Sequence, residues 1–453
     1  MTGKRGRRRA GLVLAAAMLL VTGIARPAAA AAAPAISDGV VRIGLILDMS
    51  GPFSKVTGAG SATAARMAVE DFGGKVLGAP IEVLIADHKA NPDRAANIAR
   101  DWFENRHVDA IMDVSGSSPA LVVQAIANTE HKIVILNAPG ARRLSGKACT
   151  PTSIHYVFNT TAIANTVAPD LVLRGERSWF FITADYSFGY DLTRDAEAVV
   201  AAHGGTVLGE ARHPLGAHDF TSYLARARAS GAAVIALANS GADLAGTIAD
   251  AAHLGMIPGR QTIAALDLRI NAVHALGLQT TQGMMLAKAF YWDLNDATRR
   301  WSKRFFDRMK EMPNSLQAGV YSSTTHYLQA VAHAGTDATD PVLAAMREMP
   351  IHDFFARNGH IRADGLMVHD MYLFQVKAPA ESRHPWDYFN LIATVSGADA
   401  FGTPAQSNCP LDKAELPAKS GGSREPPRPG TAAPARAAAR DVTARRRAAA
   451  GAP

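Results

Sequence analysis

The chain has 453 residues, of which 48% are hydrophobic and 19% charged, and its formal net charge is +7. The length allows two domains with good cores. The ends, residues 1–33 and 413–453, carry +6 each, which leaves −5 for the body between them. Nucleic-acid binding by the body is therefore not indicated.

The first 33 residues have the pattern of an export signal peptide. Five basic residues precede an apolar core at 10–24 that is too short to span a bilayer, and alanines up to Ala33 offer cleavage sites. An N-terminal membrane anchor is the alternative. No cysteine lies near the cleavage region, so a lipid anchor is not expected. We therefore expect a soluble periplasmic protein, exported by the Sec or the twin-arginine route.

Residues 413–453 are rich in Ala, Pro, Arg and Gly and have no apolar periodicity. Such a segment cannot bury enough apolar surface to offset the entropy lost on ordering, so we predict a disordered tail. Between the two ends, the sequence contains no run of 18 or more apolar residues, so no membrane-spanning helix is predicted there.

A six-residue phrase occurs twice in the body, as GGKVLG at 73–78 and GGTVLG at 204–209. Each copy follows a predicted strand, polar loop and helix, and precedes a strand, an Asp-bearing loop, a helix and a third strand. Two β-α-β-α-β units predict two similar lobes. In such sheets, ligands bind beyond the carboxyl ends of the strands.

The first unit begins with a continuous apolar strand at 41–47, typical of a parallel sheet buried on both faces. A helix at 60–72 and a strand at 81–86 follow. Asn91, Pro92 and Asp93 mark the start of the next helix. A strand at 110–114, a helix at 119–129 and a strand at 132–136 complete the sheet.

The second unit has predicted strands at 179–183, 206–211, 233–238, 262–266 and 283–287, with helices at 191–203 and 220–229. Helices at 298–311 and 317–334 and strands at 371–376 and 388–394 come later. We assign residues 36–157 and 287–366 to lobe 1, and 158–286 and 367–412 to lobe 2. The fold class is thus α/β, with two Rossmann-like lobes of parallel-rich sheets joined by a multi-crossover hinge.

Cys149 and Cys409 are the two cysteines of the chain. In an exported protein, two cysteines indicate one disulfide, which would hold the C-terminal strap across a long loop. Two separate buried thiols are the alternative.

The sequence contains no pattern of catalytic residues. It has no Walker loop, no G-x-S-x-G elbow and no H-E-x-x-H, and its 15 histidines lack ligand spacing. We therefore expect no enzymatic activity, no cofactor and no metal site.

Polar residues follow several predicted strands, at the edge where a cleft would form. Ser117 and Ser118 precede a helix, where exposed amides and hydroxyls favour a carboxylate, although simple N-capping is equally expected. Arg142 or Arg143 could clamp an acid. Residues 185–188, with Tyr186 and Phe188, offer an aromatic wall with hydroxyls, although Tyr186 could simply lie on the lobe surface. Weaker candidates at analogous strand ends are Asn239, Ser240, Asp267 and Tyr321.

Longer phrases of the chain resemble one protein family. They are IGLILDMSG (43–51), AVEDFGG (68–74), TADYSFG (183–189), AFYWDLND (289–296), QAGVYS (317–322), HDMYLFQV (369–376) and CPL (409–411). Together they resemble the type I periplasmic solute-binding proteins of ABC importers, in the leucine/isoleucine/valine-binding-protein-like group. The resemblance covers residues 38–412 and is closest to an aromatic-acid-associated branch.

The resemblance implies a binding protein that closes its two lobes on a small carboxylate-bearing solute, an aromatic acid or an amino acid, and delivers it to ABC permease subunits. It implies a monomer and these ligand-binding residues: Lys55, Ser117, Ser118, Gly140, Ala141, Arg142, Tyr186, Asn239, Asp267 and Tyr321. Arg142 and Asp267 depart from the pattern of the family, which places a plain leucine or coumarate ligand in doubt. A ligand-sensing module without transport is the alternative function.

Overall fold

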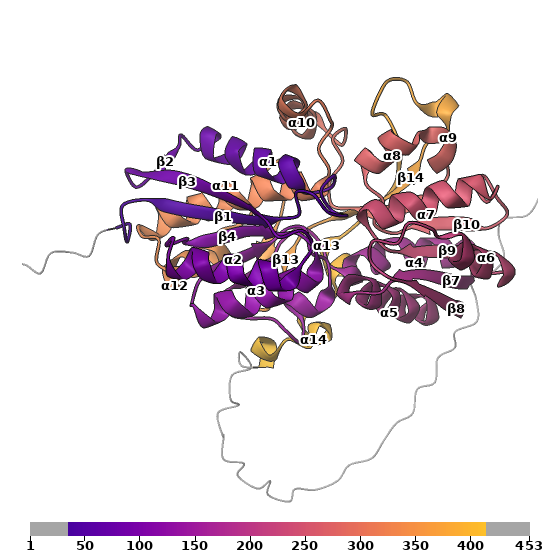
Figure 1. Ribbon diagram of the computed structural model, residues 1–453, viewed down its shortest axis with the longest axis horizontal. Helices are drawn as coiled ribbons and strands as arrows, with labels where there is room; N and C mark the ends of the chain where they lie inside the picture. Colours follow the sequence, from indigo (N-terminus) through magenta and orange to yellow (C-terminus); the bar gives the residue numbers. More distant parts are fainter. Residues whose placement is uncertain (1–34, 414–453) are drawn as a thin grey trace, which may run out of the picture. The chain divides into compact units, whose positions relative to one another are not determined.

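The computed structural model describes residues 35–413, and the predicted signal peptide and residues 414–453 of the predicted tail lie outside this range. The described part contains a six-stranded sheet, a seven-stranded sheet and a small two-stranded sheet (Figure 1). No helix in it is long and apolar enough to cross a membrane.

The six-stranded sheet has the order β2-β3-β1-β4-β5-β6. Its strands are parallel except for β2, which pairs antiparallel with β3. The strands are β1 (Val41–Leu47), β2 (Lys75–Val76), β3 (Ala79–Asp87), β4 (Ala110–Val114), β5 (Ile133–Leu136) and β6 (Ser153–His155). The apolar run at 41–47 is the strand next to the centre, as a sheet covered on both faces requires.

Helices cover both faces of this sheet (Figure 1). On one face, α2 (Pro92–Glu104) and α3 (Ser117–Thr129) share a core with β1 and β4. On the other lie α1 (Gly58–Asp71) and α11 (Ser315–Ala334), which pack against each other, with α10 (Asp296–Met309) and α12 (Thr339–Glu348) beside them. The Asn91 side chain accepts from the Arg94 amide and Pro92 occupies the first turn, so α2 starts where its sequence predicts.

The seven-stranded sheet has the order β15-β14-β11-β10-β9-β7-β8. The strands β7 to β11 run parallel, and β14 and β15 complete the sheet in antiparallel pairing. They are β7 (Ser178–Ala184), β8 (Thr206–His213), β9 (Val234–Ala238), β10 (Thr262–Ala265), β11 (Met285–Lys288), β14 (Met371–Val376) and β15 (Phe389–Val395). Its helices are α4 (Thr160–Leu173), α5 (Ser187–Ala202), α6 (Thr221–Ala229), α7 (Gly241–His253), α8 (Ile270–Leu276), α9 (Leu278–Thr281) and α13 (Gly397–Phe401).

The two sheets repeat one another, as the duplicated phrase predicts. The order β3-β1-β4-β5-β6 of the first corresponds to β8-β7-β9-β10-β11 of the second. The duplicated Gly-Gly turns follow α1 and α5, and Gly73, Gly74 and Gly204 all have positive φ. Glycine adopts this conformation without a steric penalty, which explains why both copies retain it.

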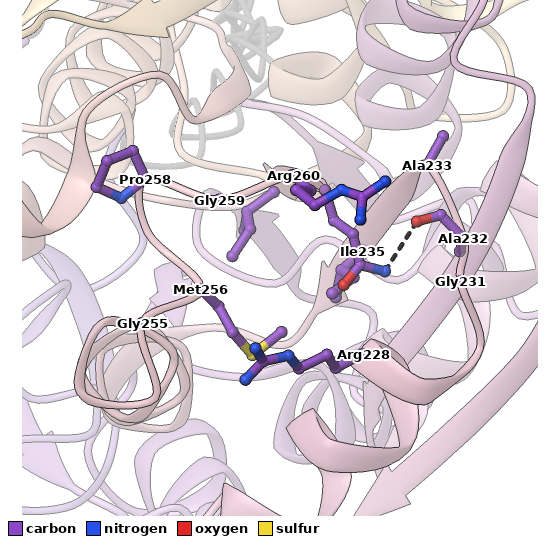
Figure 2. Close-up of a pocket in the computed structure, with 12 residues that line it drawn as sticks. Arg228, Gly231, Ala232, Ala233, Ile235, Gly255, Met256, Pro258, Gly259 and Arg260 are labelled. Carbon is purple, nitrogen blue, oxygen red and sulfur yellow. Dashed lines mark hydrogen bonds between the residues drawn. The ribbon is translucent and has the colours of Figure 1, made fainter.

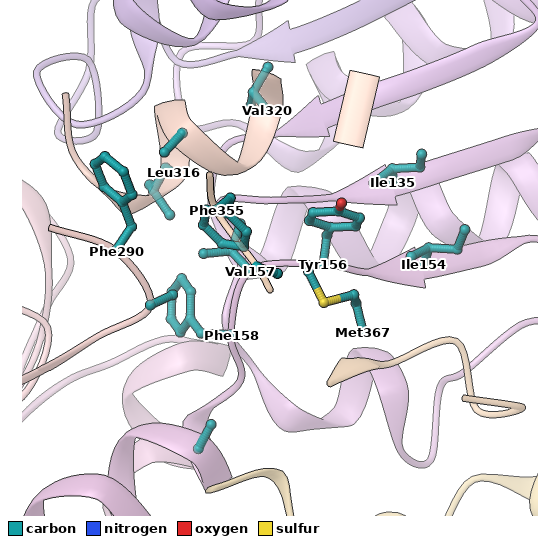
Figure 3. Packing of buried hydrophobic residues seen from close by; sticks show 14 of the residues in the cluster. Ile135, Ile154, Tyr156, Val157, Phe158, Phe290, Leu316, Val320, Phe355 and Met367 are labelled. Atoms are coloured by element: carbon teal, nitrogen blue, oxygen red, sulfur yellow. The ribbon is translucent and has the colours of Figure 1, made fainter. Parts of the chain in front are cut away.

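The chain passes between the sheets after β6, after β11, and again between β13 (Met367–Val368) and β14. The core is continuous through these crossings. Figure 3 shows Tyr156, Val157 and Phe158 of the first crossing beside Leu316 and Val320 of α11. This packing makes the connection a shallow hinge between packed lobes.

Several elements have no counterpart in the sequence predictions, among them α4, α7, α12, β6 and the small hairpin of β12 (His360–Ile361) and β13. The helix α4 is buried on almost all sides, so it lacks the apolar and polar alternation that marks a surface helix. The helix α5 begins at Ser187, four residues before the predicted start at Asp191, and Tyr186 occupies its N-cap position in an extended conformation without a side-chain capping bond.

The C-terminal strap, which we define as residues 402–413, contains α14 (Pro404–Ser407) and a short 3₁₀ turn at Pro410–Lys413. The strap is bonded to the first lobe through a disulfide between Cys149 and Cys409, whose Cα atoms are 5.8 Å apart. The predicted disulfide is confirmed, and the alternative of two separate buried thiols is excluded.

Candidate functional site

The carboxyl ends of the two parallel sheets face one small cavity of about 20 Å³. The loops after β1, β4 and β5 contribute Phe53, Gly116, Ser117 and Gly140 from the first lobe. The loops after β7, β9 and β10 contribute Tyr186, Phe188, Ser240, Asp267 and Arg269 from the second. This volume holds about one water molecule.

The wall formed by the first lobe consists mainly of backbone and small side chains. Gly116 (φ 80°) is the N-cap of α3, and the Ser117 hydroxyl accepts a hydrogen bond of 3.1 Å from the Ala141 amide. A Cβ at Gly140 would lie 2.4 Å from the ring of Phe158 and 2.8 Å from that of Phe188, so only glycine fits. This wall offers hydrogen-bond donors at a helix N-terminus, where an anion is favoured.

Four aromatic rings surround the cavity. The Tyr186 ring lies 6.1 Å from both Phe53 and Phe188, and Phe158 meets Phe188 edge-on at 6.5 Å. Burial raises the pKa of Tyr186 well above its usual value, and the nearby Asp267 acts in the same direction, so this phenol is neutral. The rings form an apolar enclosure suited to a flat or hydrocarbon group.

Asp267, Arg269 and Lys288 form a buried charged cluster at the wall of the second lobe, with side chains 3%, 4% and 5% exposed. Asp267 accepts from Ser240 (2.7 Å) and from Arg269 Nη2 (2.8 Å) on Oδ2, and Lys288 Nζ lies 3.5 Å from Oδ1. The Arg269 guanidinium also lies 5.5 Å from the centre of the Phe158 ring. Burial lowers the pKa of Lys288 to about 7, while Asp267 acts in the opposite direction.

The lobes touch across the cavity. The Ala242 amide donates to the Pro52 carbonyl at 3.1 Å, and the hydroxyls of Ser118 and Ser187 lie 3.2 Å apart. Beside the cavity, Arg142 pairs with Asp195 of α5 at 2.9 Å, and Arg143 pairs with Asp191. The residues that line the cavity and the contacts between the lobes therefore lie on the same two facing surfaces.

Four of the residues predicted to bind ligand line the cavity, namely Ser117, Gly140, Tyr186 and Asp267. Ser118 and Ala141 are their neighbours in the chain. Ser118 bonds to Ser187 across the lobes, and Ala141 is buried with its amide on Ser117.

The other four predicted residues lie outside the cavity. Arg142 is held by Asp195 and by the carbonyl of Gln406, because a buried carboxylate beside it requires a cation. Asn239 bonds His213 and Thr247 within the second lobe. Lys55 is exposed in the loop before α1, and Tyr321 donates to Asp71 at 2.6 Å.

The sequence predictions did not include Arg269, Lys288 or the rings of Phe53 and Phe158 as site residues. A signal for Lys288 was present, since it interrupts an otherwise apolar run at 284–291 and lysine is almost never buried without a partner. Arg269 carries a weaker signal, two residues beyond Asp267. Nothing local marks the phenylalanines, because core and pocket rings look alike in sequence.

A larger cavity of about 700 Å³ lies elsewhere on the second lobe, near Arg228, Met256 and Arg260 (Figure 2). It is lined by residues that precede β9 and β10, at the amino ends of these strands. Ligands of open α/β sheets bind at the opposite edge, so we do not assign the site to this cavity.

A family model described as periplasmic binding protein matches residues 40–382. The chain belongs to this family. Its fold accordingly is that of the type I periplasmic binding proteins, as the resemblance implied.

Two solved structures are similar to this periplasmic binding protein over most of its length. One is a periplasmic binding protein from Burkholderia mallei, with 45% identity and a TM-score of 0.80, over 82% of this chain and 99% of that one. The other is a branched-chain amino acid ABC transporter periplasmic ligand-binding protein from Burkholderia xenovorans, with 34% identity and a TM-score of 0.74, over 82% and 100%.

Among curated proteins, Leu/Ile/Val-binding protein homolog 6 of Brucella abortus is 26% identical over 204 residues, which is 45% of this chain. The chain spans about half the length of the curated relatives that it matches. All three proteins are named as binding proteins or their homologues, and the Burkholderia xenovorans protein is named as part of an ABC transporter.

Proposed function

We propose that this periplasmic binding protein is the extracytoplasmic solute-binding component of an ABC importer and captures a small carboxylate-bearing solute by closing its lobes. The observation that carries the proposal is the cavity itself, which is built from the carboxyl ends of both sheets. A solute that contacts both walls binds more tightly when the lobes are close together, so its binding favours the closed arrangement.

Hydrogen-bond donors on both walls of the cavity support the proposal that the solute carries a carboxylate. The first lobe presents the N-terminus of α3 at Ser117, and the second presents the guanidinium of Arg269. The four rings between them accept an aromatic or branched hydrocarbon group. Arg269 thus takes the role that the sequence reasoning gave to Arg142.

Thermal unfolding of the mature exported protein tests the binding step. We expect a carboxylic acid that fits to raise the melting temperature, since a ligand at 100 times its Kd stabilises by about 2.7 kcal/mol. The panel contains branched-chain amino acids, hydroxycinnamates, benzoates and short dicarboxylates. If no acid shifts the transition, the carboxylate assignment is wrong.

Uptake by cells tests the transport step. Deleting the gene should abolish import of the acid that binds, and restoring the gene should rescue it. Normal import in the deletion strain, with loss of a transcriptional response to the acid, would favour a ligand-sensing role instead.

A further inference from the structure

The charged cluster of Asp267, Arg269 and Lys288 is unbalanced. Below about pH 7, where Lys288 is charged and the neighbouring buried Asp113 is neutral, the cluster holds two cationic side chains and one carboxylate in a buried part of the protein. Ser240, the other polar residue bonded to Asp267, is neutral. A buried charge without a partner is costly, so a cluster with one surplus positive charge favours an anionic ligand.

One donor of this cluster has no partner. Arg269 Nε makes no hydrogen bond, although the side chain is 96% buried, as its 4% exposure shows. The same side chain lines the cavity at the carboxyl end of β10 and lies over the Phe158 ring. A guanidinium edge with a free N–H is suited to a carboxylate, whose oxygens match its spacing.

Asp267 is already paired with cations of its own lobe. Its Oδ2 accepts from both Ser240 and Arg269, and its Oδ1 faces Lys288. Among the residues that line the cavity in the described part of the chain, Asp267 is the one carboxylate. An α-amino acid would therefore place its ammonium group near the Arg269 guanidinium, and the cavity lining offers it no second carboxylate.

We propose that this site selects carboxylic acids that carry no α-ammonium group, with the acid carboxylate on Arg269 and the hydrocarbon part among the four rings. This inference rests on the proposed function and narrows its solute class, because it excludes the amino acids that the family resemblance allows.

Matched pairs of compounds test the selection, since each pair differs only in the ammonium group. Titration calorimetry on the mature protein compares 3-phenylpropanoate with phenylalanine, and 4-methylpentanoate with leucine. We expect each acid to bind at least tenfold more tightly than its amino partner. Equal or tighter binding of the amino partner overturns the inference and leaves the proposed function standing, whereas failure of all four compounds and of the wider acid panel counts against both.

Two variants separate the roles of Arg269 and Asp267. Arg269→Gln should weaken 3-phenylpropanoate at least tenfold and leave its neutral amide, 3-phenylpropanamide, within threefold. Arg212→Gln is the matched control, because Arg212 loses the same charge on the exposed strand β8, where it pairs with Glu210. Equal effects of the two substitutions on the acid would overturn the assignment of Arg269.

Asp267→Asn should change ligand affinity in opposite directions, depending on whether Asp267 limits the surplus positive charge or holds an ammonium group. If the surplus positive charge binds the acid, this isosteric change increases the surplus and should tighten 3-phenylpropanoate severalfold. If Asp267 instead holds an ammonium group, the change weakens leucine and phenylalanine. Unfolding midpoints verify that Arg269→Gln and Asp267→Asn are folded. If either variant is unfolded, Lys288→Gln is measured in its place. Lys288→Gln should weaken binding of 3-phenylpropanoate but not of 3-phenylpropanamide.

Discussion

At the scale of single residues, Lys288 links the charge of the cavity to pH. Burial, against the opposing effect of Asp267 and with a smaller contribution from the Arg269 charge, lowers its pKa to about 7. Below pH 7 the lysine is charged and the cluster carries its surplus; above pH 7 the lysine is neutral and the surplus disappears. Asp113, which interacts electrostatically with Arg269, has a pKa raised to about 7 by burial and gains negative charge over the same range.

We therefore expect the affinity for 3-phenylpropanoate to fall as pH rises from 6 to 9. A bound carboxylate stabilises the charged lysine, so binding at pH 8 should take up protons. Calorimetry in buffers with different ionisation enthalpies measures this uptake. Lys288→Met should abolish most of the effect, and Asp113→Asn isolates the part due to Asp113. A flat affinity between pH 6 and 9 would contradict the prediction.

Gly140 is a residue where one methyl group should disturb the site. An alanine Cβ would lie 2.4 Å from Phe158 and 2.8 Å from Phe188. Forcing these rings apart costs about 1–3 kcal/mol and moves the ring on which Arg269 lies. Gly140→Ala should thus weaken the acid roughly tenfold or more, as measured by calorimetry.

Gly44→Ala is the control for this prediction. Its Cβ would meet Trp102 at 2.3 Å, in the core of the first lobe and away from the cavity. This variant should lower the melting temperature without a comparable change in Kd. Similar losses of affinity in both variants would mean that Gly140 acts only through general stability.

At the scale of elements, the strap depends on its covalent bond. Its 3₁₀ turn and α14 contribute few buried side chains, and Cys409 is bonded to a residue 260 positions earlier. Replacing both cysteines by serine should lower the free energy of unfolding by about 2–5 kcal/mol. Denaturant titration measures this loss, and Kd should change little because no strap residue lines the cavity. Free thiols in the native exported protein would refute the bond.

The elements that sequence pattern predicts best are those with local signals. The helix α2 begins at the predicted cap because Asn91, Pro92 and Asp93 act within one turn. The helix α4 escaped prediction because burial around almost its whole circumference removes the periodic signal. The same limit applies to the pocket phenylalanines, whose role depends on which loops the fold brings together.

At the scale of the whole described molecule, ion pairs join the two lobes beside the cavity. Arg142 and Asp195 join the loop after β5 to α5 without touching the cavity. Arg142→Ala should weaken closure by about 1 kcal/mol, since the arginine is partly exposed. The affinities for 3-phenylpropanoate and for its neutral amide should then fall by the same factor, which calorimetry compares. Loss for the acid alone would show that Arg142 contacts the carboxylate, as the sequence predicts.

The sequence by itself determined the duplicated architecture, because the order of strands, helices and Gly-Gly turns is encoded by local patterns that recur. It also placed Ser117, Gly140, Tyr186 and Asp267 at strand ends, and parallel sheets bring those ends to one edge. Only the tertiary structure decided which cation faces the cavity. Arg142 and Arg269 both follow strands, but a buried Asp195 holds the first, whereas the second lies over Phe158 with an unpaired N–H. That choice depends on long-range neighbours, which no local pattern specifies.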